Sequence, residues 1–155
     1  MLKLKNGNIL ESDANIICHQ VNCQGVMGAG LALQIRKRYP SAFEEYRGTC
    51  TKAAGNRQDL MGTIQLSPVG QRKLIAHCFG QFGYGRYGCH TDYDALRKAM
   101  TRVCAFAKET SMSIAIPYGI GCGLAGGNWL TVKRILSEVF ADSNVDVTIY
   151  ALQQS

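Results

Sequence analysis

The chain has 155 residues, enough for one domain of ordinary size with a buried core. Its hydrophobic content is 46%, but no apolar run approaches the roughly 20 residues of a membrane span. The start also lacks the long apolar segment of a signal peptide. We therefore expect a single domain over residues 1–155 that is cytoplasmic, monomeric and without membrane association.

The formal net charge is +6, which favours nucleotides, phosphates or polyanions as partners. A solvated basic surface would give the same total. The basic residues are spread along the chain, and "RKR" at 36–38 is the only tight cluster. Because there is no basic tail and no RNP-like aromatic motif, a dedicated nucleic-acid module is poorly supported.

The seven cysteines are odd in number and scattered, and no two form a C-x-x-C pair. This pattern argues against a zinc site or a thioredoxin-like motif. Reduced thiols in a cytosolic protein explain it better. We expect no metal and no cofactor.

In chain order, the apolar patterns predict a strand at 2–5, a strand at 15–22, helices at 29–38 and 41–53, strands at 62–68 and 73–79, a helix at 91–109, a strand at 113–118, a helix at 128–141 and a strand at 145–152. The runs "NIICHQVN", "KLIAHCF" and "SIAIPY" are rich in β-formers and look buried on both faces. Strands alternating with helices predict an α/β fold, a mostly parallel sheet with helices on both faces.

Two helix starts carry candidate caps. Thr91 with Asp94 resembles a capping pair ahead of the third helix, and Asn128 precedes the fourth. Within the third helix, Leu96, Met100 and Val103 recur at the spacing of an amphipathic helix.

Glycine-rich sequence follows two of the predicted strands, in loops 22–30 and 118–127. In an open α/β sheet, ligands bind beyond the carboxyl ends of the strands, so the two loops are expected to meet. Glycine allows close approach of the backbone, and backbone N–H groups at a helix start bind anions. A diphosphate between the loops would fit. Asn22, at the end of its strand, suits a sugar diol, although closing a turn would also explain it.

The segment "GCGLAG" satisfies the G-x-G-x-x-G pattern of dinucleotide-binding folds. It lies near the end of the chain, however, with one helix and one strand after it. The usual position is the first strand-to-helix turn, so this interpretation is rejected. A P-loop is excluded because no Gly-Lys-Ser/Thr follows.

Together, "VNCQGVMGAGLALQIRKRYP" and "IPYGIGCGLAGGNW" resemble the macrodomain family of ADP-ribose-binding modules. The similarity covers nearly the whole chain. It is closest to the branch of terminal ADP-ribose protein glutamate glycohydrolases, DNA ADP-ribosyl glycohydrolase antitoxins and the yeast ADP-ribose-1''-phosphate phosphatase. The resemblance implies a three-layer α/β/α fold, with a central, mostly parallel mixed sheet of about six strands and ADP-ribose across its top.

The resemblance also implies roles by position. It places adenine near the 7–9 segment and an aromatic of the last strand, the distal ribose near Asn22, and the phosphates on both loops. The implied ligand-binding residues are Gly7, Asn8, Ile9, Asn22, Gly25, Val26, Met27, Gly28, Gly30, Gly119, Ile120, Gly121, Cys122, Gly123, Leu124 and Tyr150. Tyr150 could instead pack the sheet.

Two departures from the family bear on binding and catalysis. Asn8 stands where the family usually has Asp, so an uncharged acceptor would meet the adenine amino group. The loop "CFGQFGYGRYGCHTDY" has no lysine, and Ala125 occupies the aspartate position of the glutamate glycohydrolase. A lysine-dependent covalent mechanism therefore does not carry over.

The remaining catalytic candidates are His19, His77 and His90, of which we expect His90 to be the most exposed. A lone histidine is more often structural than catalytic, so a structural role is favoured for each. An anion-binding loop would stabilise a thiolate at Cys122, but in the family this position contributes its backbone, so it is no nucleophile candidate. Gln81, Tyr84 and Arg86 belong to the loop expected to border the distal ribose.

The sequence thus predicts a protein that binds ADP-ribose, or ADP-ribosylated protein or nucleic acid. One hypothesis is a hydrolase acting at the distal ribose, on an ADP-ribosyl linkage or on ADP-ribose-1''-phosphate, with Asn22 orienting that ribose. The alternative is a reader module without turnover. A basic nucleic-acid binder is a third hypothesis.

Overall fold

The computed structural model describes residues 2–152 and contains one six-stranded sheet flanked by helices. Its elements are β1 (Leu2–Asn6), the 3-10 helix η1 (Ile9–Glu11), β2 (Ile16–Val21), α1 (Gly30–Arg38), α2 (Pro40–Lys52), the 3-10 helix η2 (Arg57–Leu60), β3 (Ile64–Gly70), β4 (Lys73–Phe79), α3 (Tyr93–Thr110), β5 (Ile114–Pro117), α4 (Trp129–Phe140) and β6 (Val147–Ala151). The predicted strands and α-helices are confirmed, with bounds that differ by no more than two residues. The sequence pattern does not predict the two 3-10 helices.

The strand order is β1-β6-β5-β2-β4-β3. Every neighbouring pair is parallel except β3 and β4, which form an antiparallel hairpin. The predicted mostly parallel, mixed sheet is therefore confirmed. The central strand, β2, lies between β5 and β4.

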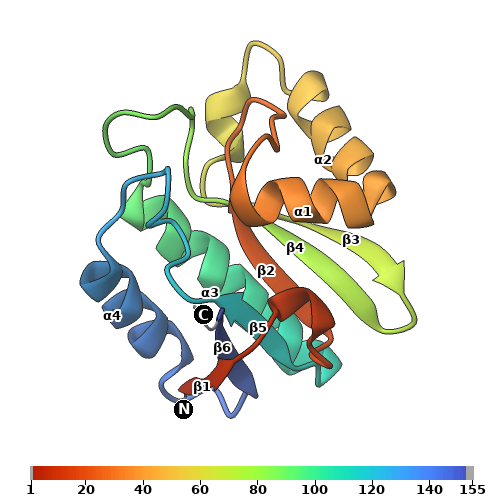
Figure 1. Cartoon of the computed structure of the whole chain (residues 1–155), viewed down its shortest axis with the longest axis vertical. Helices are drawn as coiled ribbons and strands as arrows, with labels where there is room; N and C mark the ends of the chain where they lie inside the picture. The colour runs from red at the N-terminus through yellow and green to blue at the C-terminus, as the bar shows by residue number, and fades with distance from the viewer. Residues whose placement is uncertain (1, 153–155) are drawn as a thin grey trace.

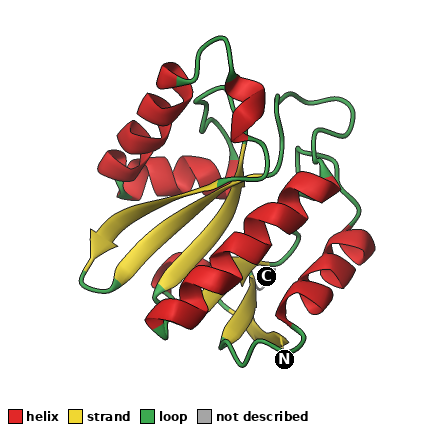
Figure 2. Ribbon diagram, turned by 180° about the vertical axis from the view of Figure 1, so that it is seen from behind, coloured by secondary structure: helices red, strands yellow, loops and turns green. Residues whose placement is uncertain are grey.

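Helices cover both faces of the sheet, as Figures 1 and 2 show from opposite sides. Helices α3 and α4 pack on one face through Leu96, Met100 and Leu136, and α1 and α2 cover the other through Ile35 and Phe43. Burying such a side chain contributes roughly 1.5–3 kcal/mol. This is the three-layer α/β/α architecture that the resemblance implies.

The helix caps agree with the sequence in one case and not in the other. Asn128 caps α4, because its side-chain oxygen accepts the N–H groups of Leu130 and Thr131 at 2.9 and 3.3 Å. The cap predicted for α3 at Thr91 is wrong. Asp92 is the N-cap there and accepts the Ala95 N–H at 3.0 Å, and this leaves the Thr91 hydroxyl for a different contact.

Strand β2 pairs unequally with its two neighbours. It pairs with β4 along six residues, from Ile16 to Val21, but with β5 only at Ile16 and Ile17. Beyond Ile17 the strands β2 and β5 separate, and Figure 1 shows them parting toward the loops that follow. A gap between neighbouring parallel strands of this kind is where open α/β sheets accept ligands.

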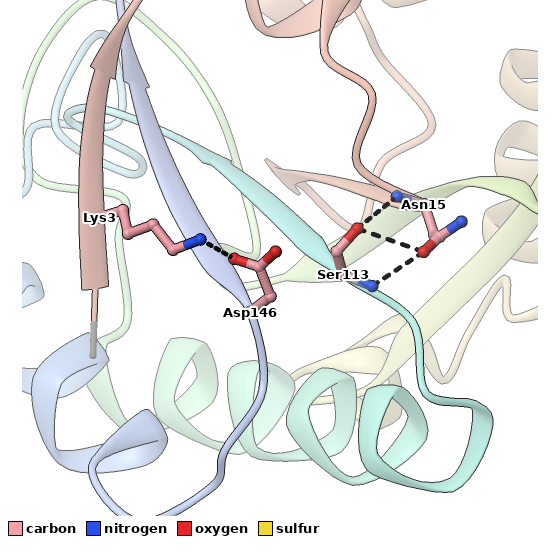
Figure 3. Close-up of polar contacts among 4 residues, drawn as sticks. All are labelled: Lys3, Asn15, Ser113 and Asp146. Atoms are coloured by element: carbon pink, nitrogen blue, oxygen red, sulfur yellow. Dashed lines mark hydrogen bonds and ion pairs between the residues drawn. The ribbon is translucent and has the colours of Figure 1, made fainter.

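The other end of the same two strands is held together by Asn15 and Ser113 (Figure 3). Each donates its backbone N–H to the other's side-chain oxygen, at 3.1 and 2.9 Å, and the Ser113 hydroxyl donates to Asn15 Oδ1 at 3.2 Å. The Asn15 amide group also donates to the Arg72 carbonyl oxygen at 2.9 Å, in the turn before β4. One side chain thus joins the starts of β2, β5 and β4.

We expect Asn15→Ala to lower the free energy of unfolding by about 1–3 kcal/mol, because it removes several hydrogen bonds and leaves partly buried polar groups unpaired. The exposed Lys3–Asp146 ion pair, also drawn in Figure 3 with a 2.7 Å separation, provides a control. Asp146→Ala should cost about 0–1 kcal/mol. Urea unfolding measures both, and equal losses would contradict the assigned role of Asn15.

Candidate functional site

A cavity of about 690 Å³ opens at the carboxyl ends of β2 and β5, where the two strands have separated. It is lined by the end of β2, both glycine-rich loops and the loop after β4. The lining residues are 19–22, 26, 28–32, 81, 84–86, 117–121 and 123–125. The two loops singled out in the sequence therefore meet at one cavity.

The first wall is the start of α1, which has no side-chain cap. Ala29 occupies the N-cap position and offers no acceptor to the first N–H groups of the helix. Gly28, Gly30 and Leu31 line the cavity, so the uncapped end of the helix faces it. Such an end attracts an anion through its N–H groups and its partial positive charge.

The second wall is the loop between β5 and α4, which uses only part of its own hydrogen-bonding capacity. The Cys122 N–H donates to the Gly119 carbonyl oxygen at 2.8 Å. Within residues 2–152, no acceptor takes the N–H of Gly119, Gly121 or Gly123, and all three glycines line the cavity. This loop therefore offers uncharged donors to an anion.

Asn22 lies at the cavity edge, 7% exposed, with its side chain largely engaged by the protein. Its Oδ1 accepts the Gln24 N–H at 2.9 Å, the Tyr46 hydroxyl at 2.8 Å and, more weakly, the Val26 N–H at 3.4 Å. Its amide group donates to the Val26 carbonyl oxygen at 2.8 Å. Asn22 thus closes the first loop, and one amide N–H remains without a protein acceptor among the described residues.

The residues assigned to adenine lie together beside the cavity rather than in its lining. A Cβ on Gly7 would stand 4.0 Å from the Tyr150 ring. Ile9 and Tyr150 pack in one hydrophobic cluster with Leu31, which does line the cavity. Asn8 caps η1, with its Oδ1 accepting a backbone N–H at 3.0 Å. Through Leu31, the cluster that contains Ile9 and Tyr150 of β6 therefore adjoins the cavity.

Nine of the implied residues line the cavity, namely Asn22, Val26, Gly28, Gly30, Gly119, Ile120, Gly121, Gly123 and Leu124. Gly25, Met27 and Cys122 are outside the lining. Met27 is fully buried under the first loop with Phe43 and Tyr46. Cys122 packs against the core cluster of α3 and α4.

The electrostatic expectation for Cys122 is wrong. Burial of the thiol, reinforced by the neighbouring Cys89, raises the pKa of Cys122. Desolvation disfavours the charged thiolate. Cys122 is therefore held as a thiol, in agreement with its exclusion as a nucleophile.

The loop after β4 contributes Gln81, Tyr84 and Arg86 to the lining, and Ala125 faces the cavity from the opposite loop. Of the lining side chains, all within the described chain, Arg86 alone is charged. His90 is outside the lining and is half-buried, the most exposed of the three histidines, as expected. Its backbone N–H donates to the Ala125 carbonyl oxygen at 2.6 Å.

A buried polar chain runs from the cavity into the sheet. His19 borders the cavity, and its Nε2 is 2.7 Å from Nδ1 of His77. The Nε2 of His77 is in turn 3.0 Å from the Ser67 hydroxyl. His19 is 2% exposed, and His77 and Ser67 are fully buried. The Nδ1 of His19 has no partner within residues 2–152.

Burial lowers the pKa of both histidines, that of His77 to about 3 and that of His19 well below its usual value. Proximity of the two rings lowers the pKa of His19 further. Both imidazoles are therefore neutral near pH 7, and each has one N–H. Hydrogen bonding along the chain then couples the tautomer of His19 to that of His77.

The hydrogen bonds of the buried polar residues of β2 and β4 were not predicted from the sequence. A usable signal was present, because "CHQV" places His19 and Gln20 inside a strand expected to be buried on both faces. Buried polar side chains require hydrogen-bond partners. Their identity depended on strand order, which the residues alone do not give.

Within the part of the chain that is described, no three His, Cys, Asp or Glu side chains are grouped so as to hold a metal ion. Over the same residues, no helix is both long enough and apolar enough to cross a membrane.

The chain is similar in sequence and structure to known proteins. The Macro domain family model matches residues 18–136. A DNA ADP-ribosyl glycohydrolase of Thermus aquaticus is 30% identical over 156 residues, covering 97% of this chain and 41% of that protein. An ADP-ribose 1''-phosphate phosphatase of Saccharomyces cerevisiae is 28% identical over 174 residues, covering 94% of this chain and 96% of that protein.

Among solved structures, the macrodomain of Mycobacterium tuberculosis DarG is similar with a TM-score of 0.81 and 28% identity, covering 97% of both chains. The chain thus spans about two-fifths of the full length of the glycohydrolases. It matches nearly the whole of the yeast phosphatase.

We expect stability to fall as the pH drops from about 7 to about 5.5. A histidine whose pKa is lowered by folding stays neutral in the folded state over this range. In the unfolded chain its pKa is about 6.5, so it takes up a proton once the pH falls below that value. Each such group contributes a slope approaching 1.4 kcal/mol per pH unit below 6.5. Urea unfolding at several pH values measures this slope. His77→Asn should reduce it, and a wild-type stability independent of pH over this range would contradict the buried, neutral pair.

Proposed function

The chain belongs to the macrodomain family, and we propose that it binds ADP-ribose in the cavity between β2 and β5. The observation that carries the proposal is the convergence of two sets of unpaired backbone N–H groups, from the start of α1 and from the loop after β5, on one cavity. A diphosphate bridging them would satisfy both sets without a charged side chain. The cavity volume of about 690 Å³ is within the range of small-molecule sites.

The orientation of the ligand follows from the ends of the cavity. The adenine is proposed to lie toward Ile9 and Tyr150, where the apolar cluster meets the cavity. The distal ribose is then directed to the opposite end, near Asn22, Gln81 and Arg86. The amide N–H of Asn22 that the protein does not use is available to a ribose hydroxyl.

We further propose that the protein hydrolyses a bond at the distal ribose, either an ADP-ribosyl linkage or the phosphate ester of ADP-ribose-1''-phosphate. Support comes from the activities named for the glycohydrolase and phosphatase relatives. Because Arg86 is the one charged side chain in the cavity lining of the described chain, a water would be positioned by Asn22, fixed dipoles and the substrate itself. Positioning and electrostatic preorganisation would then supply the rate enhancement.

A reader module without turnover is the second candidate. It is favoured by the cavity lining itself, which within residues 2–152 has no lysine, aspartate or glutamate. The buried His19–His77 pair is also a poor source of protons, since burial lowers the pKa of both rings. Binding would then depend on the same loops as in the hydrolase.

The cysteines bear on the compartment. All seven are free thiols, and Cys89 is exposed. Free thiols persist in a reducing environment, which supports a cytoplasmic location for the proposed function. We also propose that the protein acts as a monomer, which size-exclusion chromatography with light scattering would check.

The two candidates differ in turnover. The protein would be incubated with glutamate-linked, serine-linked and thymidine-linked ADP-ribose and with ADP-ribose-1''-phosphate, and released ADP-ribose would be quantified. Release from one substrate supports the hydrolase and identifies its linkage. Release from none, with ADP-ribose binding by calorimetry, leaves the reader.

We expect Gly123→Glu to abolish ADP-ribose binding, because it places a negative side chain where the diphosphate is proposed to lie. Apart from its chain neighbours, no atom of the described residues lies within 4 Å of a Cβ at Gly123, so the first side-chain carbon meets no clash. Gly48→Glu on α2, where a Cβ also meets nothing within 4 Å, makes the same charge change outside the cavity lining. Calorimetry should show loss of binding in the first variant only. Retained affinity in a folded Gly123→Glu protein would mean that the loop is wrongly assigned.

A further inference from the structure

Gln20 lies on β2 at the cavity floor and contacts both ends of the loop after β4. Its Nε2 donates to Gln81 Oε1 and to Thr91 Oγ1, at 2.9 Å each. Both hydrogens of the amide are therefore used. Gln81 and Thr91 are 9% and 7% exposed and also pair as an antiparallel bridge. The base of this loop is thus closed around one side chain from the central strand.

Thr91 extends this contact to the second glycine-rich loop. Since its oxygen accepts from Gln20, its own hydrogen is free to donate, and the carbonyl oxygen of Gly121 lies 2.6 Å away. The Gly127 N–H donates to the same carbonyl oxygen at 2.8 Å. Neither Thr91 nor Gly127 lines the cavity. The two donors therefore hold the Gly121 carbonyl away from the ligand space.

Gln20 also lies close against two glycines, Gly80 and Gly121. A Cβ at Gly80 would stand 2.4 Å from Gln20 Oε1, and a Cβ at Gly121 would stand 2.9 Å from the same atom. Gly121 also has a φ of 74°, which side chains rarely adopt. The loop after β4, through Gly80, and the loop after β5, through Gly121, thus both pack against the Gln20 side chain.

We propose that Gln20 and Thr91 form a clamp that keeps the peptide between Gly121 and Cys122 from flipping. Glycine changes backbone conformation easily, and a flip would turn the Gly121 carbonyl oxygen toward the cavity. A carbonyl oxygen facing a diphosphate would repel it, whereas the N–H groups of this loop attract it. Gln20 and Thr91 are then positioning residues, which act through the loop. The identity of the ligand rests on the proposed function, whereas the clamp itself does not.

Thr91→Val tests the clamp most directly, because valine keeps the size of threonine and removes the hydroxyl donor. Gln20→Met removes the two amide donors. In both variants we expect ADP-ribose affinity to fall at least tenfold by calorimetry. Hydrogen exchange of the Gly127 amide, which shares the Gly121 acceptor, should become at least tenfold faster in the ligand-free protein. Thr91→Ser, which keeps the hydroxyl, should restore both values to within about threefold of wild type.

Gln65→Met is the matched control, since Gln65 is also a half-buried glutamine with an unpartnered Oε1 but lies on β3 outside the cavity lining. It should change neither ADP-ribose affinity nor Gly127 exchange. If the clamp residues had a merely structural role, substituting them would lower thermal stability, but Thr91→Ser and Thr91→Val would not differ in ADP-ribose affinity or in Gly127 exchange. Unchanged Gly127 exchange, or affinity within twofold of wild type in folded Thr91→Val, would overturn the clamp.

Failure of the proposed function is distinguishable from failure of the clamp. If the wild-type protein does not bind ADP-ribose, the proposed ligand is wrong. The exchange of the Gly127 amide then decides the clamp alone, because this measurement uses no ligand. Faster exchange in Thr91→Val and its reversal in Thr91→Ser would still support it.

Discussion

The site depends on unequal pairing of the central strand. β2 is paired with β4 along its whole length, whereas its pairing with β5 ends after Ile17. Asn15 and Ser113 hold the two strands together at their starts, so the separation is confined to the other end. A sheet with complete pairing would have no cavity there. The glycine-rich loops that follow β2 and β5 are brought together because these strands are neighbours that part.

Where β2 separates from β5, two polar side chains of β2 border the cavity, those of His19 and Gln20. His19 forms a hydrogen bond along the sheet with His77, and His77 forms a second one with Ser67. Gln20 uses the opposite face to reach Gln81 and Thr91. Polar groups in such a place would be costly without partners. These networks satisfy part of that requirement. The Nδ1 of His19 and the Oε1 of Gln20 have no hydrogen-bond partner within residues 2–152.

The protein carries a net charge of +6. Among the described residues, however, the start of α1 and the loop after β5 contribute no charged side chain to the cavity lining. The donors that face it are backbone N–H groups, and Arg86 is the one charged side chain in the lining formed by residues 2–152. Backbone donors bind an anion only in the correct peptide orientation. The side chains that hold these loops, such as Thr91 on the Gly121 carbonyl oxygen, therefore bear on which peptide groups face the cavity.

The sequence by itself determined the six strands, the four α-helices and the two glycine-rich loops that line the cavity. Hydrophobic periodicity and glycine content report local conformation and burial, and both are properties of short segments. It did not determine that Asp92, rather than Thr91, caps α3. Nor did it determine that the Asn22 side chain forms hydrogen bonds within its own loop, or that Gln20 contacts residues that hold two loops. Those choices follow from which strands are adjacent and where their pairing stops. Only packing between distant segments sets these features, so the tertiary structure decided them.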